Sequence, residues 1–297
     1  MTPDERRRLA RVLSRLADAS VSEVLRLPQS GDGHCRRIGV TGPPGAGKST
    51  LISRLARRRL TGEGDLAILV IDPTSPISGG AILGDRIRME ELENEERIYI
   101  RSLASRESRD GLADNLPDIL AALQSFGFSE VLIETVGAGQ VAHAIRALVD
   151  TLLLVLHPGA GDQIQAMKSG ILELADIYVI AKADQPGAKE LVAELRSVRK
   201  ERSVAGAGWR PPIVLSSHGE DESMQKLAAE IDRHQAWTTV SERWEDARVL
   251  WRAQHVESLL SRRVGEVLRA LPRDALKQPI DELYRAVLRE LADPGAM

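Results

Sequence analysis

Residues 42–49 have the residue types and the spacing needed to hold a chain of phosphates. They read Gly-Pro-Pro-Gly-Ala-Gly-Lys-Ser, which matches the P-loop pattern G-x-x-x-x-G-K-[ST]. Glycines let the backbone wrap closely around an anion, and successive N–H groups at a helix N-terminus attract it. Lys48 adds a positive charge for the β- and γ-phosphates, and the Ser49 hydroxyl can reach a Mg²⁺ ion. The motif predicts a nucleoside triphosphate site formed by Gly42, Pro44, Gly45, Ala46, Gly47, Lys48, Ser49 and Thr50.

The segments on either side of this motif have the local structure that a P-loop requires. Residues 36–41 form a short run that predicts a β-strand, and residues 49–56 have helical periodicity. The order of strand, glycine-rich loop and helix separates a P-loop from a chance match in a glycine-rich turn.

Three acidic residues follow apolar runs or lie among glycines further along the chain. Asp72 ends the run 66–71, Glu134 ends the run 131–134, and Asp85 closes Gly-Gly-Ala-Ile-Leu-Gly-Asp. Carboxylates at the carboxyl ends of parallel strands face the ligand crevice. A single acid could equally cap a helix or lie in a solvated turn. Together with Ser49, the three predict a magnesium site made of Ser49, Asp72, Asp85 and Glu134.

The catalytic groups, Lys48, Glu134 and Gln140, are expected around the phosphates. Lys48 and the Mg²⁺ ion that Glu134 helps to hold would stabilise the negative charge that grows on the phosphates during transfer. Gln140 follows a Gly-x-Gly segment and could orient the attacking water, although a hydrogen bond within its own loop explains it as well. The sequence does not identify a catalytic base, and we expect slow hydrolysis that a partner accelerates.

Residues 180–184, Ile-Ala-Lys-Ala-Asp, resemble the N-K-x-D base-reading motif of GTPases. Asp184 can accept two hydrogen bonds from guanine N1–H and its 2-amino group, which adenine lacks. The aliphatic part of Lys182 could cover the base, and Ser216 could close over it through backbone N–H groups, or could form a plain turn. The usual Asn is Ala181 here, which predicts weaker nucleotide binding rather than a change to ATP.

Apolar runs alternate with helical stretches along most of the chain. Further runs lie at 98–100, 151–156, 177–181 and 213–215, and helical stretches at 112–125, 162–174, 187–200 and 222–233. This pattern predicts an α/β fold of the P-loop NTPase type: a mostly parallel sheet with helices on both faces and helical extensions at both ends.

Three parts of the chain are expected from these patterns. Residues 1–33 predict an N-terminal helical extension, 34–237 the P-loop domain, and 238–297 a C-terminal helical arm. The arm contains Trp244 and Trp251, whose large apolar surfaces need cover from the same chain or from a second copy.

Composition limits the classes of function. The 297 residues are 43% hydrophobic and carry a net charge of −3, which argues against general binding to nucleic acid or membrane surfaces. No apolar stretch approaches the roughly 18 residues of a membrane span. The only cysteine, Cys35, fits a reducing compartment, so we expect a cytoplasmic protein. His34 and Cys35 have no matching ligand cluster elsewhere in the sequence and make a weak metal site.

Taken together, the segments resemble the MeaB/ArgK-type P-loop GTPases, the G-protein chaperones of cobalamin-dependent acyl-CoA mutases. The matching pieces are GPPGAGKST, DPTSPISGGAILGDRIRM, ETVGAGQ, PGAGDQIQAMKSGILELAD and the base motif. The resemblance implies GTP/GDP and Mg²⁺ as cofactors, and GTP hydrolysis that drives loading, protection and repair of a mutase's adenosylcobalamin. It also implies a homodimer formed through the C-terminal arm, and switch segments at 72–88, 134–142 and 157–168.

The chain departs from the family pattern at Ala181 and at Val141-Ala142, where Ser-Glu is usual. These changes indicate a divergent subgroup, whose mutase could act on methylmalonyl-CoA, 2-hydroxyisobutyryl-CoA or isobutyryl-CoA.

Other functions on the same fold remain as alternatives. A GTPase that delivers a metal ion to a metalloenzyme would need a Cys/His cluster, and Cys35, His143 and His157 have no evident ligand partners in the sequence. Asp184 argues against an ATP-dependent small-molecule kinase, and nothing resembles the phosphoacceptor site of a transport-system kinase. A nucleotide-gated scaffold without turnover would be excluded by phosphate release.

Overall fold

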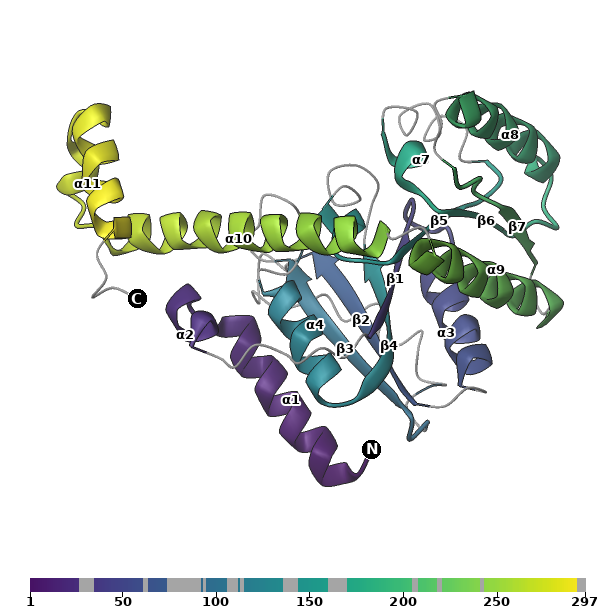
Figure 1. Ribbon diagram of the computed structural model, residues 1–297, viewed down its shortest axis with the longest axis horizontal. Coiled ribbons are helices and arrows are strands. Elements are labelled where there is room, and N and C mark those ends of the chain that lie inside the picture. The colour runs from purple at the N-terminus through teal and green to yellow at the C-terminus, as the bar shows by residue number, and fades with distance from the viewer. Residues whose placement is uncertain are drawn as a thin grey trace.

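The computed structural model describes residues 1–26, 35–60, 64–73, 92, 95–105, 112, 115–135, 144–159, 170–204, 208–217, 221–240 and 243–292. Within these residues, seven strands form one sheet in the order β3-β2-β4-β1-β5-β6-β7, and every neighbouring pair is parallel (Figure 1). The strands are β1 (Arg36–Thr41), β2 (Asp65–Pro73), β3 (Ile98–Ser105), β4 (Phe128–Thr135), β5 (Thr151–Leu156), β6 (Ile177–Ala181) and β7 (Ile213–Ser216).

The helices of the sheet region are α3 (Lys48–Arg59), α4 (Leu116–Ser125), α7 (Ile171–Leu174), α8 (Ala188–Val204) and α9 (Asp221–Val240). The chain begins with α1 (Pro3–Asp18) and α2 (Val21–Leu25), and continues after α9 into α10 (Arg243–Ala270), a short 3-10 turn (Ala275–Lys277) and α11 (Ile280–Ala292). The predicted α/β architecture with helices on both faces is confirmed.

The predicted strands are present with small changes of length. The short run 98–100 becomes the eight-residue β3, because it pairs with β2 as far as Ser105. Of the helix expected at 162–174, only α7 and the residue before it fall within the described residues. The central strands are buried on both sides, which explains their continuous apolar sequences.

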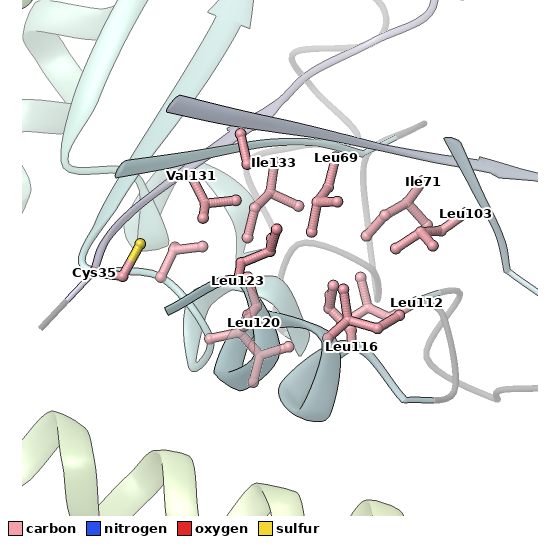
Figure 2. Close-up of a cluster of buried hydrophobic side chains, with 14 of the residues drawn as sticks. Cys35, Leu69, Ile71, Leu103, Leu112, Leu116, Leu120, Leu123, Val131 and Ile133 are labelled. Carbon is pink, nitrogen blue, oxygen red and sulfur yellow. The ribbon is translucent and has the colours of Figure 1, made fainter. Parts of the chain in front are cut away.

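Two hydrophobic layers hold the sheet between its helices. Successive side chains of a strand point to opposite faces, so Ile68 and Val70 of β2 pack in the layer of α3 and α9, while Leu69 and Ile71 pack in the layer of α4 and α1. Figure 2 shows this second layer, in which leucines of α4 lie against apolar side chains of β2, β3 and β4.

The N-terminal helix α1 is fastened to this same core. Its Leu9, Leu13 and Leu16 recur at helical spacing and are buried in the α4 layer. The helix begins with a capping box between Thr2 and Glu5, which pairs N–H groups that would otherwise lack partners.

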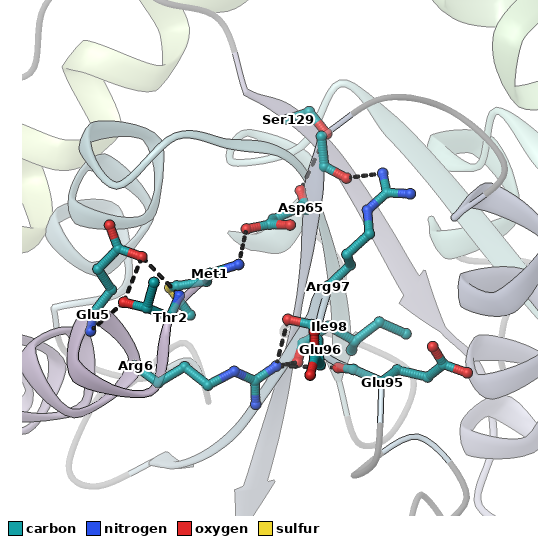
Figure 3. Close-up of polar contacts among 11 residues, drawn as sticks. Met1, Thr2, Glu5, Arg6, Asp65, Glu95, Glu96, Arg97, Ile98 and Ser129 are labelled. Atoms are coloured by element: carbon teal, nitrogen blue, oxygen red, sulfur yellow. Dashed lines mark hydrogen bonds and ion pairs between the residues drawn. The ribbon is translucent and has the colours of Figure 1, made fainter.

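Charged groups add to this attachment (Figure 3). Arg6 donates to the carbonyl oxygens of Glu95, Glu96 and Ile98 at the start of β3. The N-terminal ammonium lies 3.3 Å from Asp65 Oδ2 at the start of β2. Residues 1–18 therefore cover the α4 side of the sheet rather than project from it.

Helix α10 is long and leaves the body of the molecule. Its 28 residues span about 42 Å at 1.5 Å per residue. It crosses beside α4 and α2, and α11 lies at its far end (Figure 1). Near its start, Trp251 packs on the core under the Arg37 guanidinium, and His255 Nε2 lies 3.4 Å from Asp118 Oδ1 on α4. Trp251 is thus partly covered by its own chain.

No helix in the described part of the chain combines the length and the apolar character needed to cross a membrane.

Candidate functional site

The candidate site lies at the carboxyl end of β1, in the middle of the sheet. The chain passes from β1 to β2 on one side, whereas β5, β6 and β7 lie on the other side. In open parallel sheets, ligands bind outside the carboxyl ends of the strands at such a switch point. The P-loop follows β1 directly and ends at Gly47, the N-cap of α3.

Two glycines of the P-loop are required for different reasons. Gly42 has a φ of 144°, and a Cβ there would lie 2.0 Å from the carbonyl oxygen of Val155, so the loop must touch β5 without a side chain. Gly47 has a φ of 89°, in the left-handed region that glycine enters at no steric cost. This geometry turns the backbone into the first turn of α3, whose N-terminus favours anions.

Lys48 is buried and lies back over its own loop. Its Nζ donates to the carbonyl oxygens of Gly42 at 3.0 Å and of Pro43 at 3.1 Å. The Lys48 ammonium is therefore held beside the N–H groups of the P-loop, where the charge and the N–H groups both attract an anion.

Ser49 forms a direct hydrogen bond with one of the predicted magnesium-binding acids. Its Oγ donates to Glu134 Oε1 at 2.9 Å. Glu134 pairs with Val70 of β2, and Asp72 lies two residues beyond Val70, so both carboxylates point to the α3 side of the sheet. The exposed fractions are 4% for Ser49, 3% for Asp72 and 2% for Glu134. The structure thus brings these three oxygen-bearing groups to one edge, and this is the donor chemistry that Mg²⁺ prefers.

The predicted base-reading segment lies next to the P-loop. Lys182 has a φ of 53°, and its Nζ donates to the carbonyl oxygen of Gly45 at 3.0 Å. Asp184 is exposed on the turn that follows. The Cβ of Ala181 lies 4.0 Å from the position that a Cβ would take at Gly47. Ala181 therefore faces the P-loop, at the position where the N-K-x-D pattern has Asn.

The strand β7 completes this side of the site. The N–H of Ala183 donates to the carbonyl oxygen of Ser216 at 3.2 Å, which joins the loop after β6 to the end of β7. The guanidinium of Arg54, on α3, donates to the carbonyl oxygen of Ser217 at 3.0 Å. Arg54 could not be identified from the sequence, because one arginine among several on a helix carries no signal of a contact 163 residues away.

Two predicted site residues, Asp85 and Gln140, lie outside the described residues, as do most of the segments predicted as switches. Within the described residues, no group of three or more His, Cys, Asp or Glu side chains is placed to hold a metal ion. Burial raises the pKa of the Cys35 thiol to about 12, so this cysteine stays protonated within the core.

A second group of buried polar side chains lies at the opposite end of the strands, where β5 and β6 begin beside α9. Asp176 accepts the N–H of Leu152 at 2.8 Å and lies 3.3 Å from His234 Nε2 and 3.5 Å from Arg146 Nη1. His234 Nδ1 pairs with Thr151 Oγ1 at 2.9 Å. Burial alone would raise the pKa of Asp176, but these partners outweigh it and hold that pKa below its usual value.

Comparison with known proteins identifies the family. The family described as "Methylmalonyl Co-A mutase-associated GTPase MeaB" matches residues 7–269. A candidate GTPase of Pyrococcus abyssi is 34% identical over 298 residues, covering 99% of this chain and 91% of the relative. The mitochondrial methylmalonic aciduria type A homolog of Caenorhabditis elegans is 33% identical over 231 residues, covering 74% of this chain and 57% of the relative.

Among solved structures, the chain resembles the crystal structure of an LAO/AO transport system kinase, with a TM-score of 0.60 and 22% identity. The match covers 100% of this chain and 94% of that one, and it supports the fold. The family match begins within α1 and includes the P-loop, Asp72, Glu134 and the base-reading segment. The chain therefore belongs to the methylmalonyl-CoA mutase-associated GTPase family MeaB and is a P-loop enzyme that hydrolyses GTP.

Proposed function

We propose that this GTPase is a chaperone that gates the loading, protection and repair of adenosylcobalamin in an acyl-CoA mutase. The observation that carries the proposal is the family match along residues 7–269, because the family's description names methylmalonyl-CoA mutase. The name of the C. elegans relative, which refers to methylmalonic aciduria, supports the same partner. A chain with a single cysteine fits a reducing compartment, and we propose that the protein acts in the cytoplasm.

The experiment is co-purification with three candidate mutases, which act on methylmalonyl-CoA, 2-hydroxyisobutyryl-CoA and isobutyryl-CoA. We expect one of them to bind in a way that differs between GTP and GDP, and to accelerate phosphate release in a single-turnover assay. Equal hydrolysis rates with and without every mutase would contradict the chaperone role. Tight binding of a transition metal to the apo protein would instead favour the alternative, a metal-delivery GTPase.

In the proposed phosphate site, the P-loop N–H groups and the Lys48 ammonium bind the β- and γ-phosphates. Ser49, Asp72 and Glu134 would hold Mg²⁺, some through water, with Asp85 as a further proposed ligand. When bound, Mg²⁺ supplies positive charge next to the phosphate oxygens. The Lys48 ammonium also supplies positive charge there. The P-loop carbonyls already hold this ammonium in position, so little reorganisation is needed as charge develops on the phosphates. Gln140 is the proposed water-orienting residue.

Ser49→Ala and Ser53→Ala form a matched pair that tests this site. Both serines lie on α3 one turn apart, but Ser49 bonds Glu134, whereas Ser53 donates to the backbone carbonyl of Ser49 at 3.0 Å. We expect Ser49→Ala to raise the Mg²⁺ concentration needed for half-maximal GTP hydrolysis at least tenfold. Ser53→Ala should leave it within about twofold, because the bond that it removes runs to a backbone carbonyl of α3 and not to Glu134. Equal Mg²⁺ dependence in both variants would argue against Ser49 as a ligand.

We also propose that Lys182 and Asp184 read the base, with Ser216 beside it. Asp184 is exposed next to the P-loop contact of Lys182, so its carboxylate is open to a ligand. Asp184→Asn should reduce the preference for GDP over IDP, because IDP lacks the 2-amino group from which the carboxylate would accept a hydrogen bond. An unchanged GDP/IDP ratio would show that the base lies elsewhere.

Residues 238–297 are proposed as the arm of a homodimer. Large apolar side chains lie exposed on α10 and α11, among them Leu260, Ile280 at 81% exposed and Tyr284 at 64% exposed. Exposed apolar residues gathered on a projecting helix are typical of an interface between chains. A second copy would cover them in the way that the hydrophobic core and Arg37 partly cover Trp251.

Light scattering over a range of concentrations tests the dimer. Ile280→Asp combined with Tyr284→Asp should convert a dimer to a monomer without a change in the midpoint of thermal unfolding of the sheet region. The control is Glu282→Gln, which changes a side chain about 200° around the same helix from Ile280. A monomeric wild-type protein would refute the dimer at once.

A further inference from the structure

The loop after β7 is fixed from two sides. Its first peptide unit is held at the Ser216 carbonyl, which accepts the N–H of Ala183 at 3.2 Å. Its second is held at the Ser217 carbonyl, which accepts from the Arg54 guanidinium at 3.0 Å. Ser217 therefore has both of its flanking carbonyl groups bonded. Because peptide units are planar, this arrangement also constrains the direction of the Ser217 N–H.

Arg54 comes from the helix that begins at the P-loop. It lies six residues after Lys48, about 9 Å further along α3 at 1.5 Å per residue. The long side chain bridges from there to the end of β7, while Lys48 and Ser49 stay at the phosphate end. On the other side, Lys182 joins the base-reading loop to Gly45 of the P-loop at 3.0 Å. Contacts thus run from the P-loop to Ser217 along two separate routes.

From this geometry we infer that Arg54 is a positioning residue for guanine: it holds the Ser217 backbone so that its N–H donates to O6 of the base. The inference rests on the proposal that Lys182 and Asp184 read the base. A charged guanidinium is suited to this task, because hydrogen bonds with an ionised donor are stronger than neutral ones and hold a carbonyl more firmly. Arg54 itself does not touch the nucleotide in this scheme.

The test uses three nucleotides that differ at defined atoms of the base. GDP and IDP both carry O6, whereas 6-thio-GDP has a sulfur there, which accepts hydrogen bonds only weakly. GDP and 6-thio-GDP carry the 2-amino group that Asp184 would bind, and IDP lacks it. Loss of the Arg54 contact should therefore weaken the binding of nucleotides that carry O6. Loss of the Asp184 contact should weaken the binding of nucleotides that carry the 2-amino group.

Arg54→Met in the 297-residue chain keeps the aliphatic part of the side chain and removes its hydrogen-bond donors. We expect the affinities for GDP and IDP to fall about fivefold each, which corresponds to one hydrogen bond, and that for 6-thio-GDP to change less than about twofold. Arg54→Lys, which restores a charged donor, should recover part of the loss for GDP and IDP only. Arg57→Met, an exposed position one turn along α3, should leave all three affinities unchanged.

The outcomes separate this inference from the base site on which it rests. Equal losses for all three nucleotides in Arg54→Met would mean that Arg54 only stabilises α3 and the P-loop, and would overturn the inference. No loss for any nucleotide would overturn it as well. Asp184→Asn is measured in parallel. If it reduces the difference in affinity between GDP and IDP, the proposed base site is supported, whatever Arg54→Met shows.

Discussion

Replacing Ala181 with asparagine should tighten nucleotide binding, because it restores a side chain that can join the base-reading loop to the P-loop. Ala181 ends β6, and its Cβ lies 4.0 Å from the Cβ position of Gly47. The amide of an asparagine extends about 2 Å beyond its Cβ, so it reaches the P-loop backbone without a shift of either segment.

The size of the effect follows from one hydrogen bond. A net gain of about 1 kcal/mol corresponds to about a fivefold lower Kd for GDP. The bond already made by Lys182 to Gly45 limits the gain, since the two loops are partly held together before the substitution.

Titration of wild type and variants with a fluorescent GDP analogue measures this. Ala181→Leu is the matched control, because the leucine side chain has the same number of heavy atoms, branched at the same carbon, as asparagine and cannot hydrogen-bond. We expect the asparagine variant to bind more tightly than wild type, and the leucine variant to bind equally or more weakly. If both variants lose affinity equally, added volume next to Gly47 is the dominant effect, and the reasoning about the missing amide is refuted.

Two further predictions concern stability. Asp176→Asn should lower the free energy of unfolding at pH 7 by about 3 kcal/mol, because it removes the charge of a buried carboxylate that lies against His234 and Arg146. Since the folded-state pKa of Asp176 lies below its ordinary 3.8, the carboxylate's contribution is present above that value and is lost as pH falls through the folded-state pKa. Urea unfolding should thus show the difference from wild type shrinking below about pH 4, and a constant difference would contradict the pairing. Gly42→Ala should cost at least about 2 kcal/mol, since its Cβ would lie 2.0 Å from the Val155 carbonyl. Gly45→Ala, where a Cβ meets nothing within 4 Å, should cost about 1 kcal/mol, and equal losses in thermal unfolding would argue against the close contact with β5.

The local elements of the site could be predicted from sequence because each depends on near neighbours in the chain. The P-loop needs only its glycines, Lys48 and the flanking strand and helix, and all of these lie within about twenty residues. The apolar runs identified a buried parallel sheet for a similar reason, since strands covered on both faces must be apolar throughout. That Asp72 and Glu134 share an edge followed from their places at strand ends.

Tertiary structure alone decided the contacts between distant segments. The bond between Ser49 and Glu134 joins residues 85 positions apart, and it depends on β1 and β4 being neighbours, which hydrophobic patterns do not specify. The bond from Arg54 to Ser217, the group of Asp176 with His234, and the packing of Trp251 on its own core are of the same kind. A residue's type and its neighbours in the chain determine which interactions it can make, but strand order and helix packing determine which partner comes within reach.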